Sequence, residues 1–198
     1  DQLLSEIKKD SESKYNCLIG VSGGVDSSYL AYLAKEEFGL RPLALHLDNG
    51  WNSKLAVKNI SKIIRKLGID LHTHVINWNE FRELQLAYLR ASVLDIEVPT
   101  DHAIRAAMYT TAKGNGIKYI LRGYNRHTEG IIPKAWTFYK LDLNNLLDIH
   151  SQYGKGTLET YPMMGTREMK RIERDCGIKT VAPLNYMEFD EENVKSII

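Results

Sequence analysis

The feature that most constrains the fold of this chain is a regular alternation of strand-like and helix-like segments. Short apolar runs typical of buried strands occur at residues 15–21, 41–48, 70–76, 117–122 and 178–184. Helical periodicity is found at residues 26–38, 53–67, 78–94, 100–113, 141–153, 165–176 and 190–198. Such alternation favours right-handed crossovers and a parallel sheet that helices cover on both faces. We therefore predict an α/β protein, a Rossmann-like three-layer α/β/α sandwich with a mainly parallel five-stranded sheet.

Length and composition agree with one domain of this kind. The chain has 198 residues, of which 43% are hydrophobic and 26% charged, which argues against a disordered or collagen-like chain. The two cysteines exclude a disulfide scaffold and a four-cysteine zinc site. The formal net charge of +1 gives no overall case for binding nucleic acid or a membrane. Neither a membrane span nor a signal peptide is evident, so we expect a cytoplasmic protein. We expect neither nucleic acid nor a membrane as its partner.

The segment LIGVSGGVDSS carries the first expected strand directly into the first expected helix. Gly23 and Gly24 allow a tight backbone turn, and the following helix has a partial positive charge at its N-terminus. Ser22, Ser27 and Ser28 add hydroxyl donors, so this loop predicts a cradle for phosphate. The alternative is a turn rich in serine and glycine that only caps a helix.

The motif SGGVDSS at residues 22–28 matches neither a Walker A loop nor a dinucleotide fingerprint. It resembles the PP-loop of the ATP pyrophosphatase superfamily. The resemblance implies that residues 1–198 form a single PP-loop domain, with ATP and Mg²⁺ as cofactors and AMP transferred to a substrate oxygen. The ATP-binding residues that it implies in this loop are Ser22, Gly23, Gly24, Val25, Asp26, Ser27 and Ser28. Because the chain begins at Asp1, we expect it to be the core of a longer protein.

Asp26 is an unusual residue for a phosphate-binding loop because its carboxylate is negatively charged. It makes sense either as a magnesium ligand or as a helix-capping group. The resemblance favours the first alternative, so we expect Asp26 to be both the metal ligand and a catalytic residue.

The second expected strand ends in HLDNGWNS at residues 46–53. A short acidic-Asn-Gly run in this place resembles the GMP synthetase type of PP-loop enzyme. The resemblance implies that His46, Asp48, Asn49 and Gly50 lie beside the nucleotide. An ordinary Asp-Asn-Gly turn is the alternative, since those residues favour turns by themselves. Trp51 is expected to stack on the substrate, with simple packing as its alternative.

The fourth expected strand runs into GYNRHTEG at residues 123–130. Gly123 permits close backbone approach, and in PP-loop enzymes the corresponding loop closes over the α-phosphate and the substrate. We expect Gly123 and Asn125 to contact ATP, and Thr128 and Glu129 to contact the substrate. Arg122 is a candidate catalytic residue that would stabilise negative charge during the transfer. A solvated surface arginine is the alternative.

The segment PTDHAIR at residues 99–105 opens a helix. Thr100 fits the N-cap position, and the charge of Asp101 suits the first helical turn. His102 has no role in capping, because a cation is unfavourable there. A neutral histidine beside a carboxylate is suited to acid–base chemistry or to holding a substrate hydroxyl, so we predict catalytic roles for Asp101 and His102.

Most of the chain also resembles the N-acetyl sugar amidotransferases of lipopolysaccharide O-antigen and pseudaminic acid biosynthesis. The resemblance rests on SGGVDSS (22–28), HLDNGWNSKLAVKNI (46–60), residues 78–104 and GIKYILRGYNRHTEGIIPKAW (116–136). It implies that an acetamido oxygen of a sugar is adenylated with release of pyrophosphate, and that ammonia from a separate glutaminase subunit then gives an acetamidino sugar and AMP. The cysteine cluster usual near the N-terminus of that family is missing here. Whether the protein is a homodimer stays open.

Two other classes of function remain as alternatives. One is another PP-loop enzyme, either a sulfur transferase acting on tRNA or a small molecule, or an amidating ligase resembling NAD or GMP synthetase. Two scattered cysteines and a near-neutral charge argue against sulfur transfer. The other class is a nucleotide-binding protein without catalysis, whose glycine patterns differ from SGGVDSS.

Overall fold

The strands of the computed structural model form one five-stranded sheet in the part that it describes, which omits residues 1, 10–12, 127–135, 137, 188–189 and 198. The strand order is β3-β2-β1-β4-β5, and all neighbouring strands run parallel. The strands are β1 (Cys17–Gly20), β2 (Pro42–Asp48), β3 (Asp70–Val75), β4 (Tyr119–Leu121) and β5 (Lys179–Val181). The predicted parallel five-stranded sheet is therefore confirmed.

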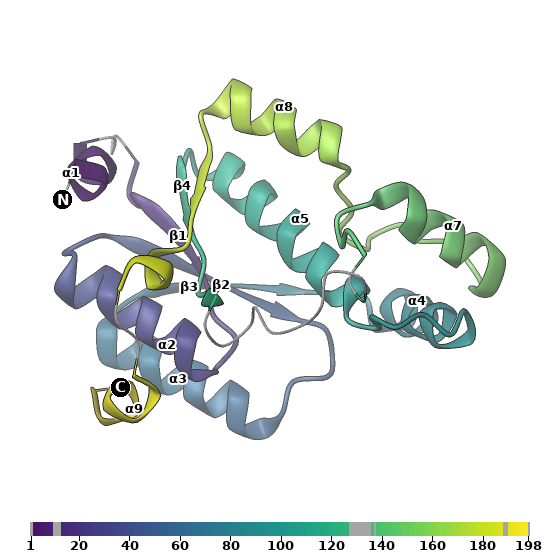
Figure 1. The fold of residues 1–198 in the computed structure, drawn as a ribbon, viewed down its shortest axis with the longest axis horizontal. Coiled ribbons are helices and arrows are strands. Elements are labelled where there is room, and N and C mark those ends of the chain that lie inside the picture. The colour runs from purple at the N-terminus through teal and green to yellow at the C-terminus, as the bar shows by residue number, and fades with distance from the viewer. Residues whose placement is uncertain (1, 10–12, 127–135, 137, 188–189, 198) are drawn as a thin grey trace.

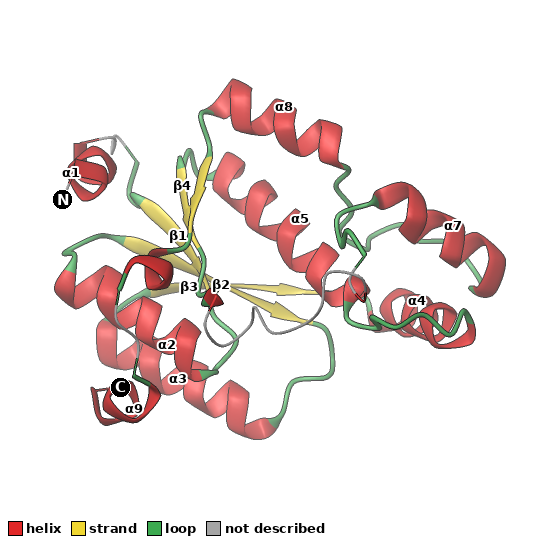
Figure 2. Ribbon diagram, in the orientation of Figure 1, coloured by secondary structure: helices red, strands yellow, loops and turns green. Residues whose placement is uncertain are grey.

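Helices flank the sheet on both faces (Figure 2). The α-helices are α1 (Gln2–Lys9), α2 (Val25–Tyr32), α3 (Lys54–Leu67), α4 (Trp78–Arg90), α5 (Val98–Gly114), α7 (Leu143–Tyr153), α8 (Thr166–Cys176) and α9 (Glu191–Ile197). A π-helical turn η1 (Leu33–Glu37) extends α2, and a 3-10 turn η3 (Pro183–Tyr186) follows β5.

Two separate hydrophobic cores show which helices cover which face. Alternate residues of β1 point to opposite faces, as strand geometry requires: Leu18 belongs to one core and Ile19 to the other. The core around Ile19 includes residues of α1, α2 and α3. The core around Leu18 includes residues of α4, α5, α7 and α8. Figure 1 shows the same division, with α2 and α3 below the sheet and α5 and α8 above it.

The strand order places the predicted loops at one edge of the sheet. From β1 the chain moves outward through β2 and β3, and then returns to β4 on the other side of β1. This reversal is a topological switch point, where parallel sheets bind ligands beyond their carboxyl ends. The loops that follow β1, β2 and β4 therefore meet at this edge.

Helix α3 confirms its predicted limits and shows why the sequence specifies them. The Ser53 hydroxyl accepts a hydrogen bond from the Ala56 N–H at 3.1 Å, which is an N-cap. Gly68 ends the helix at a φ of 60°, a left-handed conformation that glycine adopts without steric penalty. The predicted strand at 178–184 is too long, since β5 stops at Val181 before Pro183, which has no N–H for the ladder.

Helix α5 begins earlier than the sequence predicts. It starts at Val98, because Pro99 lies in the first turn, where a missing N–H is tolerated. The predicted N-cap role of Thr100 is therefore wrong. Instead, the Thr100 hydroxyl accepts a hydrogen bond from Asn49 Nδ2 at 3.3 Å. Asp101 lies in the first turn as predicted. In the described part of the chain, no helix has both the length and the apolar composition that crossing a membrane requires.

Candidate functional site

A cavity of about 1020 Å³ opens where the loops after β1, β2 and β4 converge. Eight of the residues predicted from the sequence line it: Ser22, Asp26, Ser27, His46, Asn49, Asp101, Arg122 and Gly123. They come from four separate segments of the chain. The fold thus brings residues of the predicted loops together around one cavity.

The loop after β1 is held by hydrogen bonds among its own residues. The Ser22 N–H donates to the Ser27 hydroxyl at 3.2 Å, and the Ser27 hydroxyl donates to the Gly24 carbonyl at 3.2 Å. The two serine hydroxyls lie 3.1 Å apart. Gly24 is the N-cap of α2 and has no side chain to cover the first turn. The N-terminus of α2 therefore opens toward the cavity, and its N–H groups suit an anion.

Helix α3 packs very closely against this loop. Gly23 has a φ of +80°, and a Cβ at this position would lie 2.5 Å from the Ala56 carbonyl oxygen. Asn59 Nδ2 donates a hydrogen bond to the Gly23 carbonyl at 3.2 Å. Gly23 thus shapes the loop without lining the cavity, and the same is true of Gly24, Val25 and Ser28, which also lie outside its lining.

The loop after β4 approaches the same turn from the other side. A Cβ on Gly123 would lie 3.3 Å from Ser27 Cα, so the predicted close backbone approach is confirmed. The Arg122 N–H donates to the Val181 carbonyl at 2.8 Å, and its guanidinium lies 5.8 Å from the ring centroid of Tyr124. Arg122 and Tyr124 both line the cavity.

Of the three other residues predicted after β4, the structure describes only Asn125. Asn125 is completely buried and lies outside the cavity lining. Thr128 and Glu129 fall outside the described residues.

The loop after β2 is an Asx-type turn whose hydrogen bonds are local. Asp48 Oδ1 accepts from the Gly50 N–H at 3.0 Å and from Asn52 Nδ2 at 2.9 Å. Gly50 has a φ of +80°, and a Cβ there would lie 2.7 Å from the ring of Trp78. Asp48 and Gly50 therefore make the turn and lie outside the cavity lining, whereas Asn52, which the sequence reading missed, lines it.

The residues on either side of that turn have different environments. The His46 Nδ1–H donates to the Val21 carbonyl at 3.1 Å, and this buried ring lines the cavity. Trp51 is 62% exposed and lies outside the cavity lining. Its ring centroid is 6.2 Å from that of Trp78, which supports the packing alternative.

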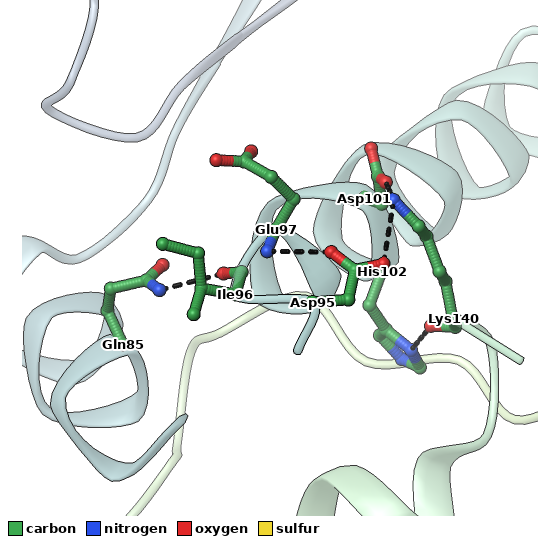
Figure 3. Close-up of polar contacts among 7 residues, drawn as sticks. All are labelled: Gln85, Asp95, Ile96, Glu97, Asp101, His102 and Lys140. Carbon is green, nitrogen blue, oxygen red and sulfur yellow. Dashed lines mark hydrogen bonds and ion pairs between the residues drawn. The ribbon is translucent and has the colours of Figure 1, made fainter. Parts of the chain in front are cut away.

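His102 is fully buried, with both ring nitrogens engaged. Its Nδ1–H donates to the Lys140 carbonyl at 3.3 Å (Figure 3). Its Nε2 accepts from the Met164 N–H at 3.2 Å. Burial lowers the pKa of this ring, so the neutral form is favoured. His102 lies outside the cavity lining. This geometry connects three segments of the chain and supports a structural role instead of the predicted catalytic one.

Asp101 does line the cavity, but its carboxylate has a partner. Lys140 Nζ forms an ion pair with Asp101 and lies 3.2 Å from Asp95 Oδ2 (Figure 3). Burial alone would lower the Lys140 pKa, yet hydrogen bonds and attraction from Asp101 and Asp95 outweigh it and raise the pKa. In this arrangement Asp101 serves as the counter-ion of Lys140.

One face of α5 supplies a wall that sequence reasoning largely missed. The α5 residues that line the cavity are Thr100, Asp101, Ile104, Arg105 and Met108. Their spacing of three or four residues places them on one side of a helix. That spacing from Asp101 was the signal that could have identified Arg105. Lys140 was missed because no local pattern connects it to the other loops.

The carboxylate of Asp26 is the candidate metal ligand at the loop after β1. It lies in the first turn of α2 and lines the cavity beside Ser22 and Ser27. The described residues contain no group of three or more histidine, cysteine, aspartate or glutamate side chains that suits a metal. Mg²⁺ commonly uses only one or two carboxylates and completes its coordination with substrate phosphates and water. Asp26 therefore fits this type of site.

Residues 1–107 match the protein family described as NAD synthase. Two curated proteins show related sequences. The NH(3)-dependent NAD(+) synthetase of Methanococcoides burtonii is 26% identical over 164 residues, which cover 81% of this chain and 57% of the relative. The glutamine-hydrolyzing GMP synthase of Aeropyrum pernix is 25% identical over 193 residues, which cover 96% of this chain and 32% of the relative. The chain thus spans 57% of the length of the first relative and 32% of the length of the second.

A solved structure supports the fold. The NMN synthetase of Francisella tularensis superposes with a TM-score of 0.50 at 19% identity, covering 97% of this chain and 78% of the other. The names of these relatives do not include a sugar amidotransferase, so that specificity stays a prediction.

Substituting Gly23 with alanine should abolish the binding of ATP, because the new Cβ would collide with the backbone of Ala56. The matched control is Gly116→Ala. Gly116 also has a positive φ, of +63°, but a Cβ there has no atom within 4 Å. The positive φ should cost each variant about 1 kcal/mol of stability, and the collision with Ala56 should add to that loss in Gly23→Ala. Calorimetric titration with ATP should show a loss confined to Gly23→Ala, and equal affinities in the two variants would contradict this role.

The buried His102 should make the protein less stable in mild acid. Since its folded-state pKa is below the ordinary 6.5, the unfolded state binds a proton first as the pH falls through that value. Urea unfolding at about pH 7.5 and 5.5 should show a larger loss of unfolding free energy in the wild type than in His102→Asn. His74, whose pKa burial also lowers, contributes equally to both proteins. Equal losses would show that His102 does not titrate in this way.

Proposed function

Because the chain belongs to the NAD synthase family, we propose that it is an AMP-forming PP-loop enzyme. It uses ATP to adenylate an oxygen atom of an acceptor and then replaces that oxygen with ammonia. The observation that carries this proposal is the cradle at the N-terminus of α2, which opens into the cavity formed by the loops after β1, β2 and β4. This site combines a phosphate-binding loop with space for a second ligand.

The phosphate cradle binds the part of ATP that leaves. The hydroxyls of Ser22 and Ser27 and the first N–H groups of α2 hold the β- and γ-phosphates. Asp26 holds Mg²⁺, which when bound offsets the negative charge of the phosphates. These contacts stabilise the additional negative charge that develops on the departing pyrophosphate, which lowers the barrier to its departure.

The reaction then takes place in the cavity, between the phosphate cradle and the face of α5 that lines it. An acceptor oxygen attacks the α-phosphorus, and the bond from that phosphorus to the bridging oxygen of the pyrophosphate breaks. Arg122, at the end of β4, stabilises the negative charge on the α-phosphate. Ammonia next attacks the activated carbon atom, and AMP leaves with the former acceptor oxygen. The net products are an amidated acceptor, AMP and pyrophosphate.

The choice of ammonia as nucleophile is supported by the names of the relatives. One is named for its dependence on NH₃ and another for hydrolysing glutamine. A separate glutaminase subunit as the ammonia source remains a proposal. The finer proposal is that the acceptor is the acetamido group of a sugar, in which case the product is an acetamidino sugar. It rests on the sequence resemblance alone.

Product analysis tests the reaction class. We expect the chain, given ATP, Mg²⁺, ammonium and a panel of acetamido sugars and carboxylic acids, to form AMP and pyrophosphate in equal amounts. Mass spectrometry of the acceptor should show the replacement of an oxygen atom by an NH group. ADP and orthophosphate as the products, or equal turnover with a sulfur donor in place of ammonium, would refute the proposal.

The role of Asp26 is tested by its isosteric variant. Asp26→Asn should weaken magnesium-dependent ATP binding at least about tenfold, because it removes the anionic ligand of the ion. The control is Asp175→Asn, since Asp175 is exposed on α8 and pairs with its neighbour Arg174. Titration calorimetry with and without Mg²⁺ measures the effect. Unchanged affinity in Asp26→Asn would remove Asp26 from the metal site.

A further inference from the structure

The cavity concentrates positive charge that the chain as a whole does not have. Among the described residues, the charged side chains that line it are four cations and two carboxylates, namely Arg105, Arg122, Arg126, Lys140, Asp26 and Asp101. The formal net charge of the entire chain is only +1. A cleft with an excess of one sign of charge attracts ligands of the opposite sign. Whether one of these cations can bind an anionic ligand depends on whether a carboxylate of the protein already forms an ion pair with it.

Lys140 already has its counter-ions. Its ammonium forms an ion pair with Asp101 and lies 3.2 Å from a carboxylate oxygen of Asp95 (Figure 3). Two carboxylates around one ammonium leave no positive charge at this corner of the cavity. A further anion would therefore gain little from approaching Lys140.

Arg105 has the opposite environment. It is half-buried at the cavity wall, one helical turn after Asp101 on α5. In the described ranges of the chain, no carboxylate forms an ion pair with its guanidinium. A cation that loses part of its hydration without gaining a counter-ion is unfavourable, and an anionic ligand would compensate for that loss.

The fold separates Arg105 from the phosphate cradle. Helix α2 packs into the core that contains Ile19, whereas α5 packs into the core that contains Leu18, so the two helices cover opposite faces of the sheet. Figure 1 shows α2 below the strands and α5 above them. Both helices contribute residues to one cavity. Arg105 and the N-terminus of α2 therefore approach the cavity from opposite faces of the sheet.

We propose that Arg105 binds a carboxylate or phosphate group of the acceptor, apart from the oxygen that is adenylated. This inference rests on the proposed function and adds the charge class of the acceptor to it. A guanidinium offers paired N–H donors that match either anion. On the same face of α5, Ile104 and Met108 offer apolar contact to the body of the acceptor. Thr100, hydrogen-bonded to Asn49, adds polar contact beside them.

The test measures acceptor binding to the full chain saturated with Mg²⁺ and a non-hydrolysable ATP analogue. Three probes share an acetamido group: UDP-N-acetylglucosamine carries phosphates, N-acetylneuraminic acid carries a carboxylate, and N-acetylglucosamine carries neither. We expect an anionic probe to bind about tenfold or more tightly than the neutral sugar in titration calorimetry. The variant Arg105→Gln should remove that difference. Arg105→Lys should keep part of it, since it retains the charge without the paired donors.

The control variant is Arg171→Gln, because Arg171 is exposed on α8 and lies outside the cavity lining. It should keep the full preference for the anionic probe. The probe that gains affinity identifies phosphate or carboxylate as the preferred group. Equal binding of all three probes to the wild type, or an unchanged preference in Arg105→Gln, overturns the proposal.

Binding of the ATP analogue alone separates this inference from the proposed function. If Arg105→Gln loses affinity for the analogue itself, then Arg105 serves the nucleotide; the acceptor subsite is wrong, and the proposed function stands. If the wild-type chain does not bind the analogue, both proposals fail.

Discussion

The site depends on the close contact between the loop after β1 and helix α3. A side chain at Gly23 would enter the backbone of Ala56, so a residue larger than glycine would push the two elements apart. The loop after β4 comes almost as close, with Gly123 next to Ser27. Two glycines thus allow three backbone segments to converge. The proposed anion site is consequently composed of backbone N–H groups and short hydroxyls, which the packing of these segments holds in place.

The opposite wall is fixed by polar contacts between segments far apart in the sequence. His102 accepts a hydrogen bond from one segment and donates one to another, while Lys140 is held by two carboxylates. The buried His102 ring would be unfavourable without its partners, so its two hydrogen bonds favour this arrangement of α5 and its neighbours, and the partly exposed ion pair adds to it. In that arrangement Asp101 is neutralised and Arg105 is left facing the cavity.

Local patterns predicted the fold well where the signals were contiguous. The helical periodicity at residues 53–67 predicted α3 to within one residue, and the short apolar runs predicted the five strands. The errors occurred at element ends. The sequence predicts a helix from residue 100, but Pro99 lies inside the first turn of α5, and the strand predicted at 178–184 stops before Pro183. A proline is compatible with either side of a boundary, so its position alone does not fix the end.

The sequence by itself determined the strands and the strand–loop–helix order around SGGVDSS, because these signals lie in consecutive residues. Only the tertiary structure decided which side chains of residues 99–105 face the cavity. The partners of His102 lie 38 and 62 residues away, at Lys140 and Met164. Whether a histidine is a catalyst or a core residue depends on what packs against it. No pattern within one helix contains that information, since burial is created by distant segments.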